Sequence, residues 1–166
     1  HTVKRAETRG VRVRILTNSL RSNNHLAAHS AYRNHVHRLI GHGADLHEVR
    51  AKAKDRSIYM RNPVDYKKLG LHAKLILFDQ EHTFIGSTNM DPRSLHLNTE
   101  IGVFIQSSEL NQTLREKLEI DFHKRNAWHL QVADNGEIVW VADDLVLDSQ
   151  PADSVLQRLE DWFLSI

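Results

Sequence analysis

The fold of this chain is decided by residues 71–100, which read LHAKLILFDQEHTFIGSTNMDPRSLHLNTE. The opening part, 71–78, is apolar and rich in β-favouring residues, so it predicts a buried strand. Side chains alternate between the two faces of a strand, which places His72 and Lys74 on the same face. We therefore expect an imidazole and an ammonium group side by side.

A second strand is predicted to begin at Phe84, and the same alternation places Ser87 and Asn89 on one side of it. Two adjacent strands would then direct an imidazole, an ammonium, a hydroxyl and a carboxamide to one point. This set suits a phosphoryl group. Lys74 would neutralise charge, while Ser87 and Asn89 would donate hydrogen bonds to phosphate oxygens. His72 would attack phosphorus or move a proton.

The spacing of these polar residues forms a motif. Six residues share it at fixed offsets: His72, Lys74 and Asp79 as H-x-K-x4-D, then Gly86, Ser87 and Asn89 as G-S-x-N. The first half alone can recur by accident in a chain with 12 histidines. All six together at fixed offsets are far rarer, so coincidence explains the motif poorly.

The motif resembles the signature of the phospholipase D superfamily, the HKD motif. In addition, Asn98-Thr99-Glu100 lies where that family places a glutamate that holds the catalytic histidine. The resemblance implies a set of site residues: His72, Lys74, Asp79 and Glu100 as catalytic, and Lys74, Ser87 and Asn89 as phosphate-binding. In the family the signature aspartate, here Asp79, is mostly structural. The implied fold is an α/β fold, an α-β-α sandwich with a mixed, largely parallel sheet flanked by helices.

Two further segments are similar to bacterial cardiolipin synthases of this superfamily: residues 14–19 (RILTNS) and 91–94 (DPRS). The resemblance covers most of residues 10–130. It implies a phosphatidyltransferase whose substrate is a phospholipid, either phosphatidylglycerol or phosphatidylethanolamine. It places the protein in the bacterial cytoplasm or at the periphery of the inner membrane. Neither a cofactor nor a metal is implied.

The family's reaction needs two histidines: one attacks phosphorus to form a phosphohistidine, and the other protonates the leaving alkoxide. This chain carries one H-x-K-x4-D. The expected partner is therefore a second HKD half in the same polypeptide or a homodimer mate. The charged run that stops at Gly10 reads as the end of a helix whose beginning is missing, so we expect the second half of a two-motif enzyme. In that position the family's histidine is more often the general acid, and the nucleophile role stays open for His72.

Two other functions fit the same residues. One is a homodimeric, metal-independent endonuclease of the same superfamily, in which the basic residues contact backbone phosphates. The other is a non-catalytic module that binds phosphate or lipid and lacks its partner half. A net charge of +1 argues against nucleic acid, because a nuclease domain more often has a broad basic face.

Composition sets the outer limits. A chain of 166 residues with 40% hydrophobic and 26% charged residues can bury a core as one globular domain. It has no cysteine, which excludes disulfides and thiolate metal sites. No run of 18 apolar residues occurs, so no segment is expected to span a bilayer.

The elements outside the motif also follow from periodicity. The first part of the chain is predicted to be a crossover unit with parallel strands. It consists of a strand over 11–16, a helix from Asn23 or Asn24 to about Ile40, and a strand over 44–49. The remaining predictions are a strand over 100–105, a helix from Ser107 or Ser108 to about Lys124, a hairpin joining 128–132 to 137–141 through Asn135-Gly136, and an amphipathic tail over 155–166. We expect residues 1–130 to be the catalytic domain, with the hairpin and acidic tail of residues 131–166 packed on it.

Two further groups of residues lie outside the motif: the other histidines and a basic segment. The histidines outside the motif, among them His25 and His29 at a spacing of four, show no third ligand nearby, so no metal site is predicted. Residues 50–70 hold seven Lys or Arg against two Asp, with Tyr59 and Tyr66 between them. This basic segment either gathers a phosphate-bearing substrate or an anionic lipid surface, as a peripheral membrane contact, or is a solvated connection.

Overall fold

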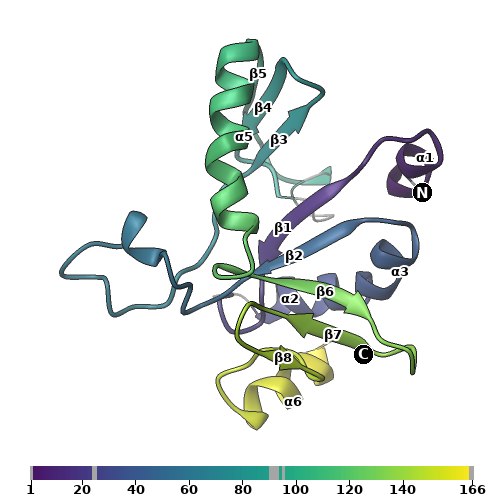
Figure 1. The fold of residues 1–166 in the computed structure, drawn as a ribbon, viewed down its shortest axis with the longest axis vertical. Helices are drawn as coiled ribbons and strands as arrows, with labels where there is room; N and C mark the ends of the chain where they lie inside the picture. Colours follow the sequence, from purple (N-terminus) through teal and green to yellow (C-terminus); the bar gives the residue numbers. More distant parts are fainter. Residues whose placement is uncertain (1, 24–25, 90–93, 95, 165–166) are drawn as a thin grey trace. The chain divides into compact units, whose positions relative to one another are not determined.

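A computed structural model of the chain describes residues 2–23, 26–89, 94 and 96–164, and of residues 26–28 the backbone alone (Figure 1). The chain forms two compact units. One comprises residues 1–71 and 122–166, and the other residues 72–121. Both combine strands with helices, which confirms the predicted α/β class.

The larger unit is built on a mixed sheet with the order β1-β2-β6-β7-β8. Its five strands are β1 (Arg14–Asn18), β2 (Asp45–Val49), β6 (Ala127–Val132), β7 (Ile138–Val141) and β8 (Val146–Leu147). β1 and β2 are parallel, as the predicted crossover requires. The other pairings are antiparallel, so the expectation of a largely parallel sheet is wrong here. Short connections between β6, β7 and β8 leave no room for the crossover that parallel pairing needs.

The helices of this unit are α1 (Thr2–Thr8), α2 (Leu26–Arg33), α3 (Val36–Gly41), the short 3₁₀ helix η1 (Arg56–Ile58) and α6 (Val155–Leu164). The single helix predicted up to Ile40 is wrong, because α2 and α3 are separate. A turn at Asn34 and His35, both weak helix formers, interrupts it, and the His35 amide donates to the Tyr32 carbonyl at 2.8 Å. The alternative cap Asn24 lies outside the described residues.

Two glycines adopt the backbone conformation that the predicted helix end and hairpin turn require. Gly10 follows α1 with a φ of 78°, a left-handed conformation that closes a helix at little cost. Gly136 has a φ of 81° in the turn between β6 and β7, which confirms the Asn-Gly hairpin. No helix in the described part of the chain has both the length and the apolar character needed to cross a bilayer.

The core of the larger unit lies where α3 packs against β2 and β6. Its buried hydrophobic residues are Val36, Leu46, Trp128, Leu130, Trp140 and Ala142. Glu48 is fully buried beside them and is satisfied by two donors: the Tyr32 hydroxyl at 3.0 Å and the Trp140 indole N–H at 2.9 Å. Burial raises the pKa of Glu48 to about 7, although both hydrogen bonds act in the opposite direction.

The amphipathic tail forms α6 as predicted, but its orientation is the reverse of the expected one. We expected Leu156, Leu159, Trp162 and Phe163 to face the body of the domain. They are between 52% and 75% exposed, while Asp161 on the opposite side is fully buried. The polar side of α6 packs inward because it has buried partners there, which the sequence pattern alone does not reveal.

The smaller unit is an antiparallel sheet, β3 (Leu75–Phe78), β4 (His82–Gly86) and β5 (Gly102–Gln106), followed by α5 (Ser108–Phe122). Ser107 caps α5 as predicted, since its Oγ accepts from the Leu110 amide at 3.2 Å. Asn111 of α5 is fully buried, and its Nδ2 donates to the His82 carbonyl at 2.7 Å. This bond fixes the helix to the first residue of β4.

Candidate active site

His72 and Lys74 lie in the extended segment that precedes β3, so the prediction that they belong to the strand is wrong. The strand begins at Leu75, where pairing with Ile85 starts. β4 ends at Gly86, and beyond it the Ser87 amide turns to the Ile101 carbonyl at 2.9 Å, so none of the described strands pairs with residues 72 and 73. His72 is exposed. The Lys74 Nζ donates to the backbone carbonyl of His72 at 3.0 Å, which holds the two residues together.

Glu100 is the centre of the polar contacts in the smaller unit. Its Oε2 accepts a hydrogen bond of 2.5 Å from the Ser87 Oγ, and its Oε1 accepts one of 3.3 Å from Asn98 Nδ2. The hydrogen bond from Ser87 is the main cause that lowers the pKa of Glu100, followed by those from Ser94 and Asn98, and the Lys74 charge acts in the same direction. Glu100 is therefore an ionised acceptor near neutral pH.

Ser94 and Asn98 are the partners of Glu100 that sequence reasoning missed. Asn98 could have been found, because residues two apart on an extended chain share a side. Ser94 is buried, and its spacing of six from Glu100 gives no comparable signal in the sequence.

The other predicted site residues are less closely assembled. Asn89 is exposed and follows β4 rather than belonging to it. Asp79 lies beyond the far end of β3 in the turn before β4, with a φ of 51°. Among the described residues no hydrogen bond joins Glu100 to His72, so the bond that the family resemblance implies is not formed in this structure. The structure thus brings together Lys74, Ser87 and Glu100.

The hydroxyl of Ser87 is fully engaged in this arrangement. Its oxygen accepts from the Ile101 amide at 3.0 Å, and its proton is donated to Glu100. A serine hydroxyl has a single proton to donate. Ser87 can therefore bind a phosphate oxygen only after this proton turns away from Glu100. Lys74, by contrast, has further N–H groups beyond the one given to His72.

A histidine cluster in the larger unit was not expected from the sequence. Asp45 and His47 lie two positions apart on β2 and therefore share a face. His129 is the cross-strand partner of His47 on β6. The three ligand atoms lie within 4.8 Å of one another, which is close enough to consider a metal ion. The sequence signal existed in the i, i+2 pair, but the strand pairing that adds His129 was not predicted.

The ring geometry of this cluster fits hydrogen bonding better than metal ligation. Nε2 of His47 and Nε2 of His129 lie 2.8 and 3.2 Å from the same oxygen of Asp45. The two rings are stacked with an angle of 8° between their planes. A metal lies near the plane of each imidazole that binds it, and two parallel planes do not share such a point. Arg12 also donates to the second oxygen of Asp45 at 2.7 Å.

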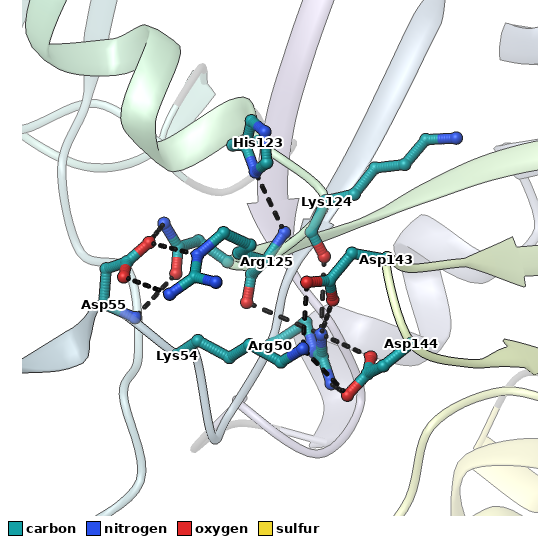
Figure 2. A network of polar contacts seen from close by, with 9 residues as sticks. Arg50, Lys54, Asp55, His123, Lys124, Arg125, Asp143 and Asp144 are labelled. Atoms are coloured by element: carbon teal, nitrogen blue, oxygen red, sulfur yellow. Dashed lines mark hydrogen bonds and ion pairs between the residues drawn. The ribbon is translucent and has the colours of Figure 1, made fainter.

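The first part of the basic segment is held in a network of ion pairs (Figure 2). Arg50 lies 3.1 Å from Asp143 and 3.0 Å from Asp144, and Lys54 lies 2.8 Å from Asp143. Asp55 is bound at 2.9 Å by Arg125, whose hydrogen bond is the main cause that lowers the pKa of Asp55. These contacts join the segment to Arg125, just before β6, and to the loop after β7. Arg50 and Lys54 are thus paired within the protein rather than available to a phosphate.

Comparison with known proteins agrees with the motif. The family model described as "Cardiolipin synthase, PLD-like domain" matches residues 1–122. Cardiolipin synthase C of Escherichia coli K12 is 34% identical over 156 residues, which cover 91% of this chain and 33% of that protein. An uncharacterized protein of Helicobacter pylori J99 is 31% identical over 160 residues, which cover 93% of this chain and 31% of that protein. Cardiolipin synthase B of E. coli K12 is 44% identical over 54 residues, 32% of this chain and 13% of that protein.

The matches differ in how much of each protein they cover. The chain spans about a third of the length of the first two relatives. No solved structure matches it. The family model nevertheless covers more than half of the chain, including the residues of the HKD motif up to Glu100. The resemblance found in residues 71–100 is confirmed, and the chain belongs to the phospholipase D-like cardiolipin synthase family.

Proposed function

We propose that this chain is one catalytic half of a phosphatidyltransferase that transfers phosphodiesters through a phosphohistidine. The observation that carries the proposal is the grouping of Lys74, Ser87 and Glu100 next to an exposed His72. An exposed imidazole can reach a substrate, and a cation beside it suits the charge of a phosphodiester.

The proposed reaction has two steps. In the first, an imidazole nitrogen attacks phosphorus, the bond from phosphorus to the leaving alcohol oxygen breaks, and a second histidine protonates that oxygen. In the second, an acceptor alcohol gives its proton to the same histidine and attacks phosphorus, and the phosphorus–nitrogen bond breaks. One histidine cannot fill both roles in one step. The second must come from another HKD half, in the same polypeptide or in a homodimer mate.

The residues around His72 have distinct proposed roles. Lys74 stabilises the charge on the phosphoryl oxygens, and Asn89 donates to one of them. Ser87 contributes after its proton turns from Glu100 to the phosphate. Glu100 then either keeps its bonds to Ser94 and Asn98 or turns to His72, where it would orient the imidazole. Asp79 shapes the turn after β3 and does not touch the substrate.

The proposal also names a class of substrate, phospholipids. Two of the relatives are named cardiolipin synthases, which supports a phospholipid donor and an alcohol acceptor on a second lipid or glycerol. Phosphatidylglycerol and phosphatidylethanolamine are the donors to test. The ion pairs of Arg50 and Lys54 remove two cations that a nucleic acid backbone would otherwise contact, which weakens the nuclease alternative.

The experiment is a transfer assay with the complete natural protein that carries this chain. Labelled phosphatidylglycerol or phosphatidylethanolamine is supplied in membranes, with excess chelator present. We expect cardiolipin or another transphosphatidylation product, and His72→Ala should lower the rate by about 10³-fold or more, as removal of a covalent nucleophile or general acid does. His37→Ala, an exposed histidine on α3, is the matched control and should retain the wild-type rate.

Three outcomes would contradict the proposal. Full activity of the His72→Ala protein would exclude His72 as a catalytic residue. Loss of activity in chelator, restored by one divalent ion, would exclude the metal-independent mechanism. Cleavage of plasmid DNA in chelator, without any lipid product, would replace the transferase with the nuclease.

A further inference from the structure

α6 is attached to the larger unit by its polar side. Asp161 is fully buried, with Oδ1 at 2.9 Å from His29 Nδ1 and Oδ2 at 3.3 Å from Arg33 Nη1. On the same side of the helix, Arg158 Nε donates to the Gln150 carbonyl at 2.9 Å. These bonds orient α6 so that its polar residues face the protein.

The apolar side of α6 consequently faces away from the unit. Its exposed residues are Val155 (68%), Leu156 (64%), Leu159 (56%), Trp162 (52%), Phe163 (75%) and Leu164 (52%). Several large apolar side chains on one helix face form a contiguous exposed patch, and such patches mark sites of interaction with proteins or membranes.

A second exposed apolar group belongs to the loop over residues 56–67. Figure 1 shows this segment, which begins with η1, extending away from the strands of its unit. Its exposed hydrophobic residues are Ile58 (51%), Tyr59 (52%), Val64 (41%) and Tyr66 (74%). Three cations lie among them, Arg56, Arg61 and Lys67, against one acidic residue, Asp65.

The base of this loop is joined to the start of α6. Lys68 forms an ion pair with Asp153, and Arg21 Nε lies 3.0 Å from the same carboxylate. The Asp153 amide in turn donates to the Gln157 side chain at 2.7 Å, inside the first turn of α6. The end of the loop, next to Tyr66, and the start of the apolar helix face are therefore neighbours, although 85 residues separate Lys68 from Asp153.

We propose that the apolar face of α6 and the loop over residues 56–67 together form a docking surface for an anionic phospholipid bilayer. Tyrosine side chains beside cations are suited to the membrane interface, where an apolar ring and a polar end are both accommodated. An amphipathic helix on a membrane usually supplies its own basic face. Here the polar face of α6 is used to hold the helix to the protein, and the loop supplies the positive charge instead.

This proposal rests on the proposed function in one respect, since a lipid substrate is what makes a bilayer the expected partner. It differs in its residues, because none of the docking residues belongs to the HKD motif. It also differs in its measurement, because binding to vesicles requires no turnover. A His72→Ala protein should bind vesicles like the wild type.

The test is sedimentation of the 166-residue chain with vesicles of phosphatidylcholine alone or with phosphatidylglycerol added, repeated with the complete natural protein. We expect binding to the anionic vesicles, weakened by salt. Arg61→Gln with Lys67→Gln should lower the partition coefficient on anionic vesicles by about 25-fold, at roughly one factor of five per cation. Lys4→Gln with Arg9→Gln removes the same charge from the region of α1 and is the matched control.

The apolar side is tested by Leu156→Ser with Phe163→Ser, which should lower binding to both kinds of vesicle. Val132→Ser on β6, at a position 48% exposed, is the control. Because the substituted side chains point outward, the thermal midpoint should stay at the wild-type value, which separates lost binding from lost folding.

Four results would overturn the docking surface. The wild type could fail to bind anionic vesicles, or both sets of variants could bind as well as their controls. In the complete protein, vesicle binding that is insensitive to the variants would mean that other parts of the chain cover this face. A dimer in analytical ultracentrifugation that Leu156→Ser with Phe163→Ser dissociates would assign the face to a second copy.

Discussion

The Oγ of Ser87 donates a 2.5 Å hydrogen bond to Oε2 of Glu100. This bond links the G-S-x-N part of the motif to the glutamate that follows it, and it commits the one proton that Ser87 can donate. In this structure the carboxylate therefore occupies the hydrogen-bond donor that the proposed function assigns to a phosphate oxygen. Under that proposal, substrate binding exchanges one anionic acceptor for another.

The first prediction concerns this bond. In Ser87→Ala, Glu100 loses the hydrogen bond that contributes most to its lowered pKa, so the pKa should rise toward the ordinary glutamate value. NMR titration of the carboxyl carbon of Glu100 measures this directly. Ser87→Thr keeps the hydroxyl and should leave the titration near that of the wild type. An unchanged titration in Ser87→Ala would show that Ser94 and Asn98 alone hold the carboxylate.

The second prediction concerns Asp79, whose φ of 51° lies in the left-handed region. Asparagine and glycine tolerate this conformation, whereas a β-branched residue does not. Asp79→Asn and Asp79→Gly should therefore leave stability within about 0.5 kcal/mol of the wild type, and Asp79→Val should cost about 1–2 kcal/mol. Denaturant unfolding of the three variants provides the comparison. If Asp79→Asn loses as much as Asp79→Val, the carboxylate rather than the backbone is what the turn requires.

Much of this structure could be predicted from sequence where local chemistry decides the outcome. The helix before Gly10, the Asn135-Gly136 hairpin and the Ser107 cap follow from backbone preferences at single positions. The fold class and the family follow from the spacing of the residues between His72 and Glu100, because so many residues at fixed offsets rarely coincide by chance.

The failures share one cause, because periodicity identifies a face and does not say what covers it. α6 has a clear apolar stripe, yet its polar side is buried by His29 and Arg33, more than 120 positions earlier in the chain. His72 and Lys74 continue the apolar run of β3, yet in the described part of the chain the strand pairing begins only at Leu75. Both outcomes are set by contacts distant in sequence, as is the meeting of His47 with His129.

The third prediction uses Glu48, whose pKa is raised from 4.5 to about 7 by burial. A carboxyl group with a raised pKa in the folded state contributes stability that is complete below pH 4.5 and is lost as the pH rises through about 7. The loss amounts to roughly 3 kcal/mol. Glutamine can still accept from Trp140 and donate to Tyr32 without acquiring a charge. The stability of Glu48→Gln relative to the wild type should therefore increase by this amount between pH 4.5 and pH 8.

Urea unfolding followed by tryptophan fluorescence at both pH values measures the difference. Taking the difference between variant and wild type cancels the titration of the other groups. Glu160→Gln, an exposed glutamate on α6, is the control and should show a difference that does not depend on pH. A constant difference for Glu48→Gln as well would mean that the buried carboxyl group does not titrate over this range.

The last prediction concerns the attachment of α6 through Asp161. Removing one partner of a buried ionic group costs about 3–5 kcal/mol, because the remaining polar groups are left buried without compensation. Asp161→Ala takes the acceptor from His29, which is almost fully buried, and from Arg33, which is 38% exposed, so we expect a loss of about 3 kcal/mol. The loss should be local as well as global: residues 151–164 should become sensitive to limited proteolysis before the sheet unfolds. Gln157→Ala removes two uncharged contacts of the same helix, the 3.3 Å bond to the Leu20 carbonyl and the exposed 2.7 Å bond from the Asp153 amide, and should cost only about 1 kcal/mol. Equal losses in the two variants, or a proteolysis pattern unchanged by Asp161→Ala, would show that α6 is held by contacts other than the buried carboxylate.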